Sequence, residues 1–163
     1  MGLVKTICFL GVDGSGKSTL VTALCDEFKS RDVDARAYYF GWKPFLPVTR
    51  LVSRLFRRRK YHITEDFNTS NKFSILKEFT LIYFFLEYIA RYLSVRLRNL
   101  SGHSSVLIFD RYFYDIYAHY SYAERSVVFP LLLRLFPRPH KLFILDVPVE
   151  VAHRRKPDMD YYT

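Results

Sequence analysis

Apolar runs alternate with amphipathic stretches along this chain. The runs 4–10, 33–40, 106–109 and 142–145 predict four strands, because each is short, largely apolar and followed by glycine or aspartate. The stretches 17–30 and about 71–100 have the spacing of apolar residues that is typical of helices. This alternation predicts an α/β fold with a doubly wound, mainly parallel sheet flanked by helices, whose ligands bind at the carboxyl ends of the strands.

The helical spacing also predicts which side chains face the core. In 17–30, Leu20, Leu24 and Phe28 lie four residues apart on one face, and charged residues point outward. The long helix has its own apolar stripe, although aromatic residues cover its other faces, so we expect neighbours on several sides. The members of that stripe are Ile75, Phe79, Ile82, Leu86, Ile89 and Leu93.

The turn after the first strand carries a phosphate-binding pattern, G-x-x-x-x-G-K-[ST]. It consists of Gly11, Val12, Asp13, Gly14, Ser15, Gly16, Lys17 and Ser18, with Thr19 directly after it. Glycines permit positive φ and a helix amino terminus attracts anions, so these nine residues predict a polyphosphate site. Lys17 is expected to reach the β and γ phosphates, and the Ser18 hydroxyl to bind Mg²⁺. The alternative is a purely structural glycine-rich turn.

Two later strands end in an aspartate. Asp110 follows four apolar residues, a pattern that places a carboxylate near Mg²⁺ in nucleotide-binding folds. Asp146 has the same setting, but Pro148 just after it favours a helix N-cap. Arg111 offers a bidentate guanidinium to an anionic acceptor. A strand-end salt bridge between Asp110 and Arg111 is the alternative interpretation.

Composition sets outer limits on function. The chain has 163 residues, enough for a single domain, and 25 Lys and Arg against 16 Asp and Glu, which favours polyanionic partners. Cys8 and Cys25 show no paired spacing and predict buried reduced thiols in a cytoplasmic protein. We expect no secretion signal, no transmembrane segment and no nucleic acid partner.

A basic amphipathic stretch follows the second strand. From Arg50 to Lys60 it carries several cations off an apolar stripe, close to Trp42 and Phe45. Such a face is either solvated or in peripheral contact with a membrane surface or another polyanion.

The combination of motifs resembles the thymidylate kinase family of P-loop kinases, over roughly residues 4–156. The resemblance rests on Gly11 to Thr19, on Asp110-Arg111-Tyr112, and on Leu145-Asp146-Val147-Pro148 with the cations Arg154, Arg155 and Lys156 after it. It implies a P-loop fold and transfer of the γ-phosphoryl group of ATP to dTMP with Mg²⁺, in a homodimer.

The resemblance also assigns roles to residues. Asp13 is expected near the acceptor sugar, and Arg111 and Tyr112 near the acceptor phosphate. Because Ser15 stands where some family members have a basic residue, a lid at about 150–163 is expected to supply the missing charge through Arg155 or Arg154.

Some positions depart from the family. Lys43 stands in Gly41-Trp42-Lys43-Pro44 where the family has an acceptor-binding arginine, and it substitutes as a point charge. Tyr83 is able to stack on a base, but Glu87 occupies the approximate position of a second arginine. These departures leave two alternatives to dTMP kinase: a kinase for another small phosphorylated or hydroxylated acceptor, related to sugars or lipids, and a nucleotide-binding switch.

The end of the chain departs as well. The family continues past the lid with a further strand and a closing helix, whose loops help to hold adenine, whereas this sequence stops at Thr163. Either the sequence is incomplete or the protein is shortened. We expect a sheet without the family's C-terminal strand and helix, and we expect a shortened chain to bind phosphates better than the base.

Overall fold

The computed structural model describes residues 5–41, 45–47, 50, 74–99 and 106–156. These residues fall into two compact units. The first unit draws on Met1–Gly41, Asn99–Tyr112 and Arg138–Thr163, and the second on Trp42–Arg98 and Phe113–Pro137. Lys43 and the basic stretch up to Lys60, apart from Arg50, lie outside the described residues, so the expectations for them stay predictions.

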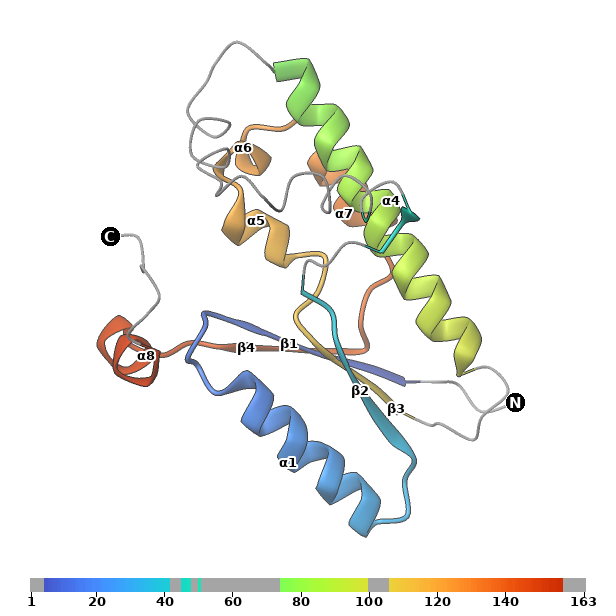
Figure 1. Ribbon diagram of the computed structural model, residues 1–163, viewed down its shortest axis with the longest axis vertical. Coiled ribbons are helices and arrows are strands. Elements are labelled where there is room, and N and C mark those ends of the chain that lie inside the picture. Colours follow the sequence, from blue (N-terminus) through green and yellow to red (C-terminus); the bar gives the residue numbers. More distant parts are fainter. Residues whose placement is uncertain (1–4, 42–44, 48–49, 51–73, 100–105, 157–163) are drawn as a thin grey trace. The chain divides into compact units, whose positions relative to one another are not determined.

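The first unit is built on a parallel sheet with the strand order β2-β3-β1-β4 (Figure 1). In the register, Asp110 is opposite both Phe9 and Tyr39, and Gly11 is opposite Leu145. The last residues of all four strands therefore lie at one edge of the sheet. The strands are β1 (Lys5–Gly11), β2 (Ala35–Tyr39), β3 (Val106–Asp110) and β4 (Lys141–Leu145).

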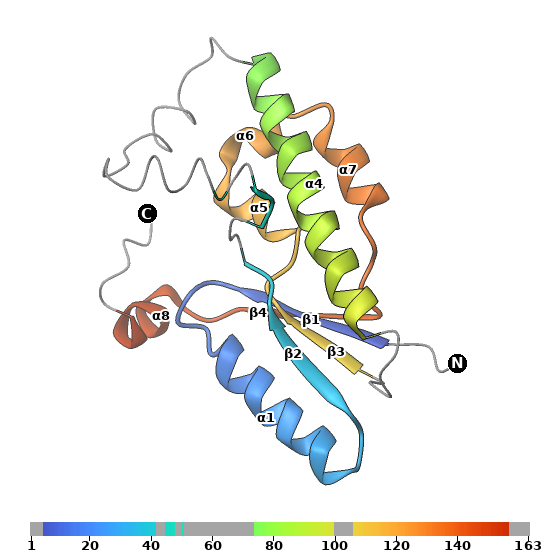
Figure 2. The same cartoon turned by 45° about the vertical axis from the view of Figure 1, so that its right-hand side comes forward.

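Helix α1 (Lys17–Ser30) has the predicted bounds and packs along one face of the sheet (Figure 2). Its Val21 and Cys25 join a core cluster with Phe9, Ala35, Val106 and Ile108. Leu24 and Phe28 pack against this cluster, as predicted, but Leu20 is 43 % exposed. The prediction was wrong for Leu20 because the buried face is centred on Val21 and Cys25, about 100° further round the helix.

Burial raises the pKa of the Cys25 thiol, with a smaller opposing effect of Lys29. Cys8 on β1 is buried as well, and both cysteines are thiols, as the sequence predicts.

Helix α8 (Val149–Arg155) follows β4. Pro148 occupies its N-cap position with φ −53° and ψ 140°, so the prediction of Asp146 as the N-cap was wrong. The extended backbone at Pro148 delays the first helical residue to Val149, which leaves Asp146 two residues outside the cap.

The second unit is helical and has an aromatic core. It contains α4 (Ser74–Arg98), α5 (Asp115–His119), α6 (Ser121–Glu124) and α7 (Phe129–Leu135). Phe113 lies at its centre, with ring centroids 4.7–5.7 Å from those of Phe85, Tyr88, Phe129 and Phe136.

The predicted stripe of α4 was wrong at several positions. Phe79, Leu86 and Leu93 are exposed, whereas Phe84 and Tyr88 are buried. The reason lies in the size of the aromatic rings: they bury more apolar area than leucine, and the rings on α4 meet those of Tyr120, Phe113 and Phe136.

The first unit confirms an α/β fold, because its four-stranded parallel sheet is flanked by α1. None of the described helices has the length and apolar character that a membrane crossing requires.

Candidate functional site at the glycine loop

The loop between β1 and α1 needs glycine for two separate reasons. Gly11, Gly14 and Gly16 have φ of 143°, 81° and 92°, values that side chains disfavour. In addition, a methyl carbon added at Gly11 would lie 2.4 Å from the carbonyl oxygen of Leu145. The loop therefore passes so close to β4 that only hydrogen fits at Gly11.

The start of α1 is built to receive an anion. Gly16 is its N-cap in the left-handed conformation, and no side chain caps the helix from that position. Backbone N–H groups of a first helical turn and the helix dipole favour negative charge, which suits a phosphate group.

Lys17 spans the loop from inside. Its side chain is only about 6 % exposed, and its Nζ donates to the carbonyl oxygens of Gly11 at 2.7 Å and Val12 at 2.6 Å. Nζ also lies 3.9 Å from a carboxylate oxygen of Asp13. These contacts hold the ammonium group inside the loop, where its positive charge suits a phosphate group.

Ser18 and Asp110 meet although 92 residues separate them. The Ser18 hydroxyl donates to Oδ2 of Asp110 at 2.8 Å. The other oxygen of Asp110, Oδ1, is buried and has no hydrogen-bond partner among the described residues. A buried carboxylate oxygen without a partner, next to a hydroxyl, suits a hard cation that prefers oxygen ligands.

The described residues contain no cluster of three or more His, Cys, Asp or Glu that could enclose a metal by itself. Mg²⁺ bound together with a nucleotide does not need one, because phosphates and water complete its coordination. Ser18 and Asp110 therefore fit Mg²⁺ delivered with a polyphosphate, and do not fit a closed structural metal site.

Arg111 turns sharply away from the end of β3. Its φ is 72°, uncommon for a residue with a side chain, and its N–H donates to the carbonyl of Phe9 at 2.9 Å. The buried guanidinium forms an ion pair with Asp13, whose other carboxylate oxygen lies 3.8 Å from Nζ of Lys156. Asp13 thus joins cations from β3, α1 and the end of α8.

The end of α8 reaches the loop through one of its two arginines. Nη1 of Arg155 donates to the carbonyl oxygen of Gly14 at 3.2 Å, and lies near Gly16. Arg154 is exposed and does not line the cavity at the loop. The sequence left open which of these two arginines supplies the predicted lid cation. Of the two, only Arg155 lies close to the loop.

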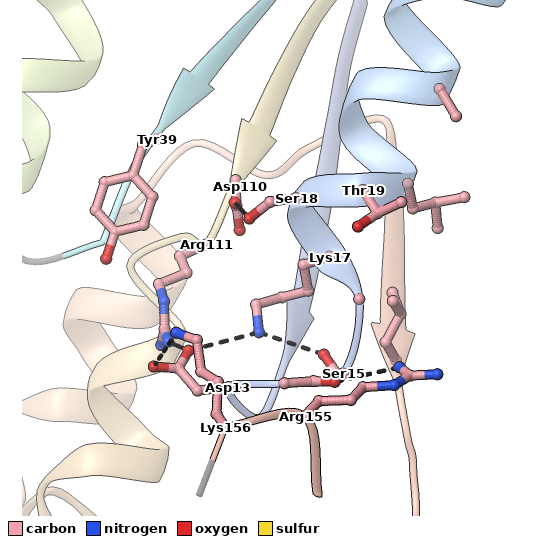
Figure 3. A pocket seen from close by; sticks show the side chains of 15 residues that line it. Asp13, Ser15, Lys17, Ser18, Thr19, Tyr39, Asp110, Arg111, Arg155 and Lys156 are labelled. Atoms are coloured by element: carbon pink, nitrogen blue, oxygen red, sulfur yellow. Dashed lines mark hydrogen bonds and ion pairs between the residues drawn. The ribbon is translucent and has the colours of Figure 1, made fainter. Parts of the chain in front are cut away.

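A single cavity of about 760 Å³ collects these side chains (Figure 3). Of the predicted site residues it includes Asp13, Gly14, Ser15, Gly16, Lys17, Ser18, Thr19, Asp110, Arg111 and Arg155. Gly11 and Val12 are not among the residues that line it, although their carbonyl oxygens accept hydrogen bonds from Lys17, which does.

Other predicted site residues lie elsewhere. Tyr112 is fully buried, 5.7 Å from Phe40 and 5.6 Å from Phe109 between ring centroids. Tyr83 belongs to the second unit, where its hydroxyl donates to Glu87 at 3.3 Å. Contact of Tyr112 or Tyr83 with a substrate stays a prediction, as does that of Lys43.

Sequence reasoning missed several residues that line the cavity. Tyr39 ends β2 beside Asp110. Its position at the carboxyl end of a predicted strand could have indicated that it lines a site. Lys156 follows the predicted lid arginines directly. Leu145 belongs to a motif that carries the family resemblance and ends β4, but it was not predicted as a site residue. No motif gives a signal for Leu20 and Ala23, since they reach the cavity through the phase of α1.

Comparisons with known proteins agree with this fold. No protein-family model matches the chain, and no curated protein matches it by sequence. Among solved structures, it is similar to the thymidylate kinase from Ehrlichia chaffeensis, with a TM-score of 0.53 and 20 % sequence identity. The match covers 95 % of this chain and 77 % of that one. At this identity the likeness shows the fold, an α/β architecture shared with a kinase.

Proposed function

We propose that the chain is an ATP-dependent phosphotransferase of the nucleoside-monophosphate kinase type, which transfers the γ-phosphoryl group of ATP to dTMP. One observation carries the proposal: a single cavity holds the glycine loop, Lys17, the Ser18 and Asp110 pair, and Arg111. Phosphoryl transfer depends mainly on positioning and on neutralising charge, and these groups supply both.

The residues divide the work by their place in the cavity. Backbone N–H groups of the loop and Lys17 bind the ATP phosphates. Ser18 and Asp110 would hold Mg²⁺, which neutralises phosphate charge when it is bound. Arg111 orients the acceptor phosphate in a bidentate fork, and Arg155 covers the loop from the side of α8.

A second candidate is a kinase for another phosphorylated acceptor, and Glu87 favours it. Where the family resemblance implies an arginine, this carboxylate is only 3 % exposed and accepts the backbone N–H groups of Phe45 and Leu46 at 3.0–3.3 Å. Tyr83 donates to the same carboxylate. A carboxylate engaged in this way does not read a thymine as an arginine would.

Two measurements test the proposal. Calorimetry with Mg²⁺-ATP should show binding, and radiolabelled ATP should transfer phosphate to dTMP or, under the second candidate, to another member of an acceptor panel. Arg111→Ala should lower transfer by about 100-fold while ATP affinity changes little, because its guanidinium serves the acceptor. Arg111→Lys, which keeps the charge but not the fork, should recover part of the activity.

The matched control is Arg134→Ala, an exposed arginine on α7, which should leave transfer unchanged. Absence of binding with every nucleoside triphosphate, for protein with a normal circular dichroism spectrum, would contradict the whole proposal. Binding of ATP without transfer to any acceptor would support a nucleotide-binding switch instead.

A further inference from the structure

Two apolar side chains on α1 remain outside the core and face the cavity. Leu20 is 43 % exposed and Ala23 is exposed as well, although the same helix buries Val21 and Cys25 against the sheet. Both Leu20 and Ala23 line the cavity at the glycine loop. Since residues three apart lie on one side of a helix, they form a continuous apolar strip.

Figure 3 shows Tyr39 and Arg111 on one side of the cavity, Lys17 and Ser18 in the middle, and Thr19 on the other side. Ala23 follows Thr19 by four residues, so it lies one turn further along the same face of α1. The strip therefore belongs to the side of the cavity that Thr19 marks. If the acceptor binds at Arg111, the γ phosphate of the donor must point toward Arg111. The nucleoside of the donor then leaves the loop past Thr19 and toward the strip.

We infer that Leu20 and Ala23 form the surface on which the nucleoside part of the donor triphosphate rests. The inference rests on the proposed function and adds the class of donor to it. Leucine and alanine side chains offer area but no hydrogen-bond donor or acceptor, so they hold a purine or a pyrimidine without reading its edge. The donor site therefore accepts the common nucleoside triphosphates with similar affinity, and is not restricted to ATP.

The size of the effect follows from the area that is still exposed. Complete burial of a leucine side chain improves binding by about one to two orders of magnitude. Covering the 43 % of Leu20 that is exposed should therefore contribute about fivefold to the affinity. Because the side chain is half outside the core already, Leu20→Ser should leave the fold intact.

Calorimetry with Mg²⁺ and five ligands tests the inference: inorganic tripolyphosphate, ATP, GTP, CTP and UTP. All four nucleotides should bind more tightly than tripolyphosphate and within about tenfold of one another. Leu20→Ser should weaken each nucleotide about fivefold and leave tripolyphosphate unchanged. The matched control is Leu131→Ser, an exposed leucine on α7, which should change none of the five affinities.

Five results would overturn the inference. Equal binding of tripolyphosphate and ATP, or no effect of Leu20→Ser, would show that the strip does not contact the nucleoside, and would leave the proposed function standing. An equal loss for tripolyphosphate would show that Leu20 acts on the loop, and preference for one base by more than about 100-fold would reveal hydrogen-bond readout. Absence of binding for all five ligands would contradict the proposed function together with the inference.

Discussion

Replacement of Gly11 by alanine should destabilise the fold for two reasons, a disfavoured backbone conformation and a steric clash with β4. The φ of 143° belongs to a region that side chains avoid, at a cost of about 1–3 kcal/mol. The new methyl carbon would also lie 2.4 Å from the carbonyl oxygen of Leu145 and 3.2 Å from its Cβ. Because that oxygen belongs to the backbone of a paired strand, the strand must shift, which adds about 1–3 kcal/mol.

Gly16→Ala is the matched control, since it carries the backbone cost alone. Its φ is 92°, and among the described residues an added methyl carbon would meet Nη1 of Arg155, at an ordinary contact distance of 3.6 Å. We therefore expect Gly11→Ala to lower the free energy of unfolding by about 2–6 kcal/mol and Gly16→Ala by about 1–3 kcal/mol.

Urea unfolding followed by circular dichroism measures both values, and the denaturation midpoints give the order directly. We expect the lowest denaturation midpoint for Gly11→Ala, an intermediate one for Gly16→Ala and the highest for the unchanged protein. Equal midpoints for the two variants would refute the close approach of β4 to the loop, because the shortest contact, with the carbonyl oxygen of Leu145, exists only at Gly11. A Gly11→Ala protein as stable as the unchanged one would refute the positive φ as well.

Three further predictions concern other parts of the molecule. Arg155→Ala should lower kcat of the proposed transfer by about 100-fold and Arg154→Ala by less than threefold, since only Arg155 reaches the loop; equal losses would contradict this. Glu78→Gln should lower the free energy of unfolding by about 1–3 kcal/mol in urea titrations, because this carboxylate accepts the Ser126 hydroxyl and two N–H groups before α7; an unchanged midpoint would contradict it. Burial raises the pKa of Tyr92 and Tyr120, so both phenols stay protonated in the fold while the unfolded chain ionises above about pH 10. The stability that these two phenols contribute should be constant below that pH and fall as the pH rises through their folded pKa values, and Tyr120→Phe should make the fall shallower in thermal scans from pH 8 to 11.

Features of the fold that depend only on residues adjacent along the chain were predictable from the sequence. The bounds of α1 agree with the prediction because a glycine with positive φ before Lys17 and a charged surface face are local properties. The four strands were predictable from short apolar runs for the same reason. The faces of the helices were not, because they depend on packing partners: Leu20 is turned to the cavity, and the aromatic side of α4 meets other rings.

In the candidate site, too, the contiguous parts were predictable and the contacts between distant segments were not. The glycine loop is contiguous, so its pattern was visible, and Asp110 with Arg111 were marked by their position at a strand end. Their partners are distant: Ser18 meets Asp110 across 92 residues, and Asp13 meets Arg111 across 98. Only the strand order β2-β3-β1-β4 brings these segments together, since β1 and β3 are neighbours in the sheet but not along the chain.

Asp13 shows what this assembly achieves electrostatically. One carboxylate lies within ion-pair distance of Lys17 from the helix start, Arg111 from the end of β3 and Lys156 from the residue after α8. Three cations from three segments would repel one another if they were brought together alone, and a shared anion allows the sheet edge to collect them. Asp13 therefore positions these cations at the loop before any anion binds. A phosphate that enters the cavity would compete with Asp13 for them.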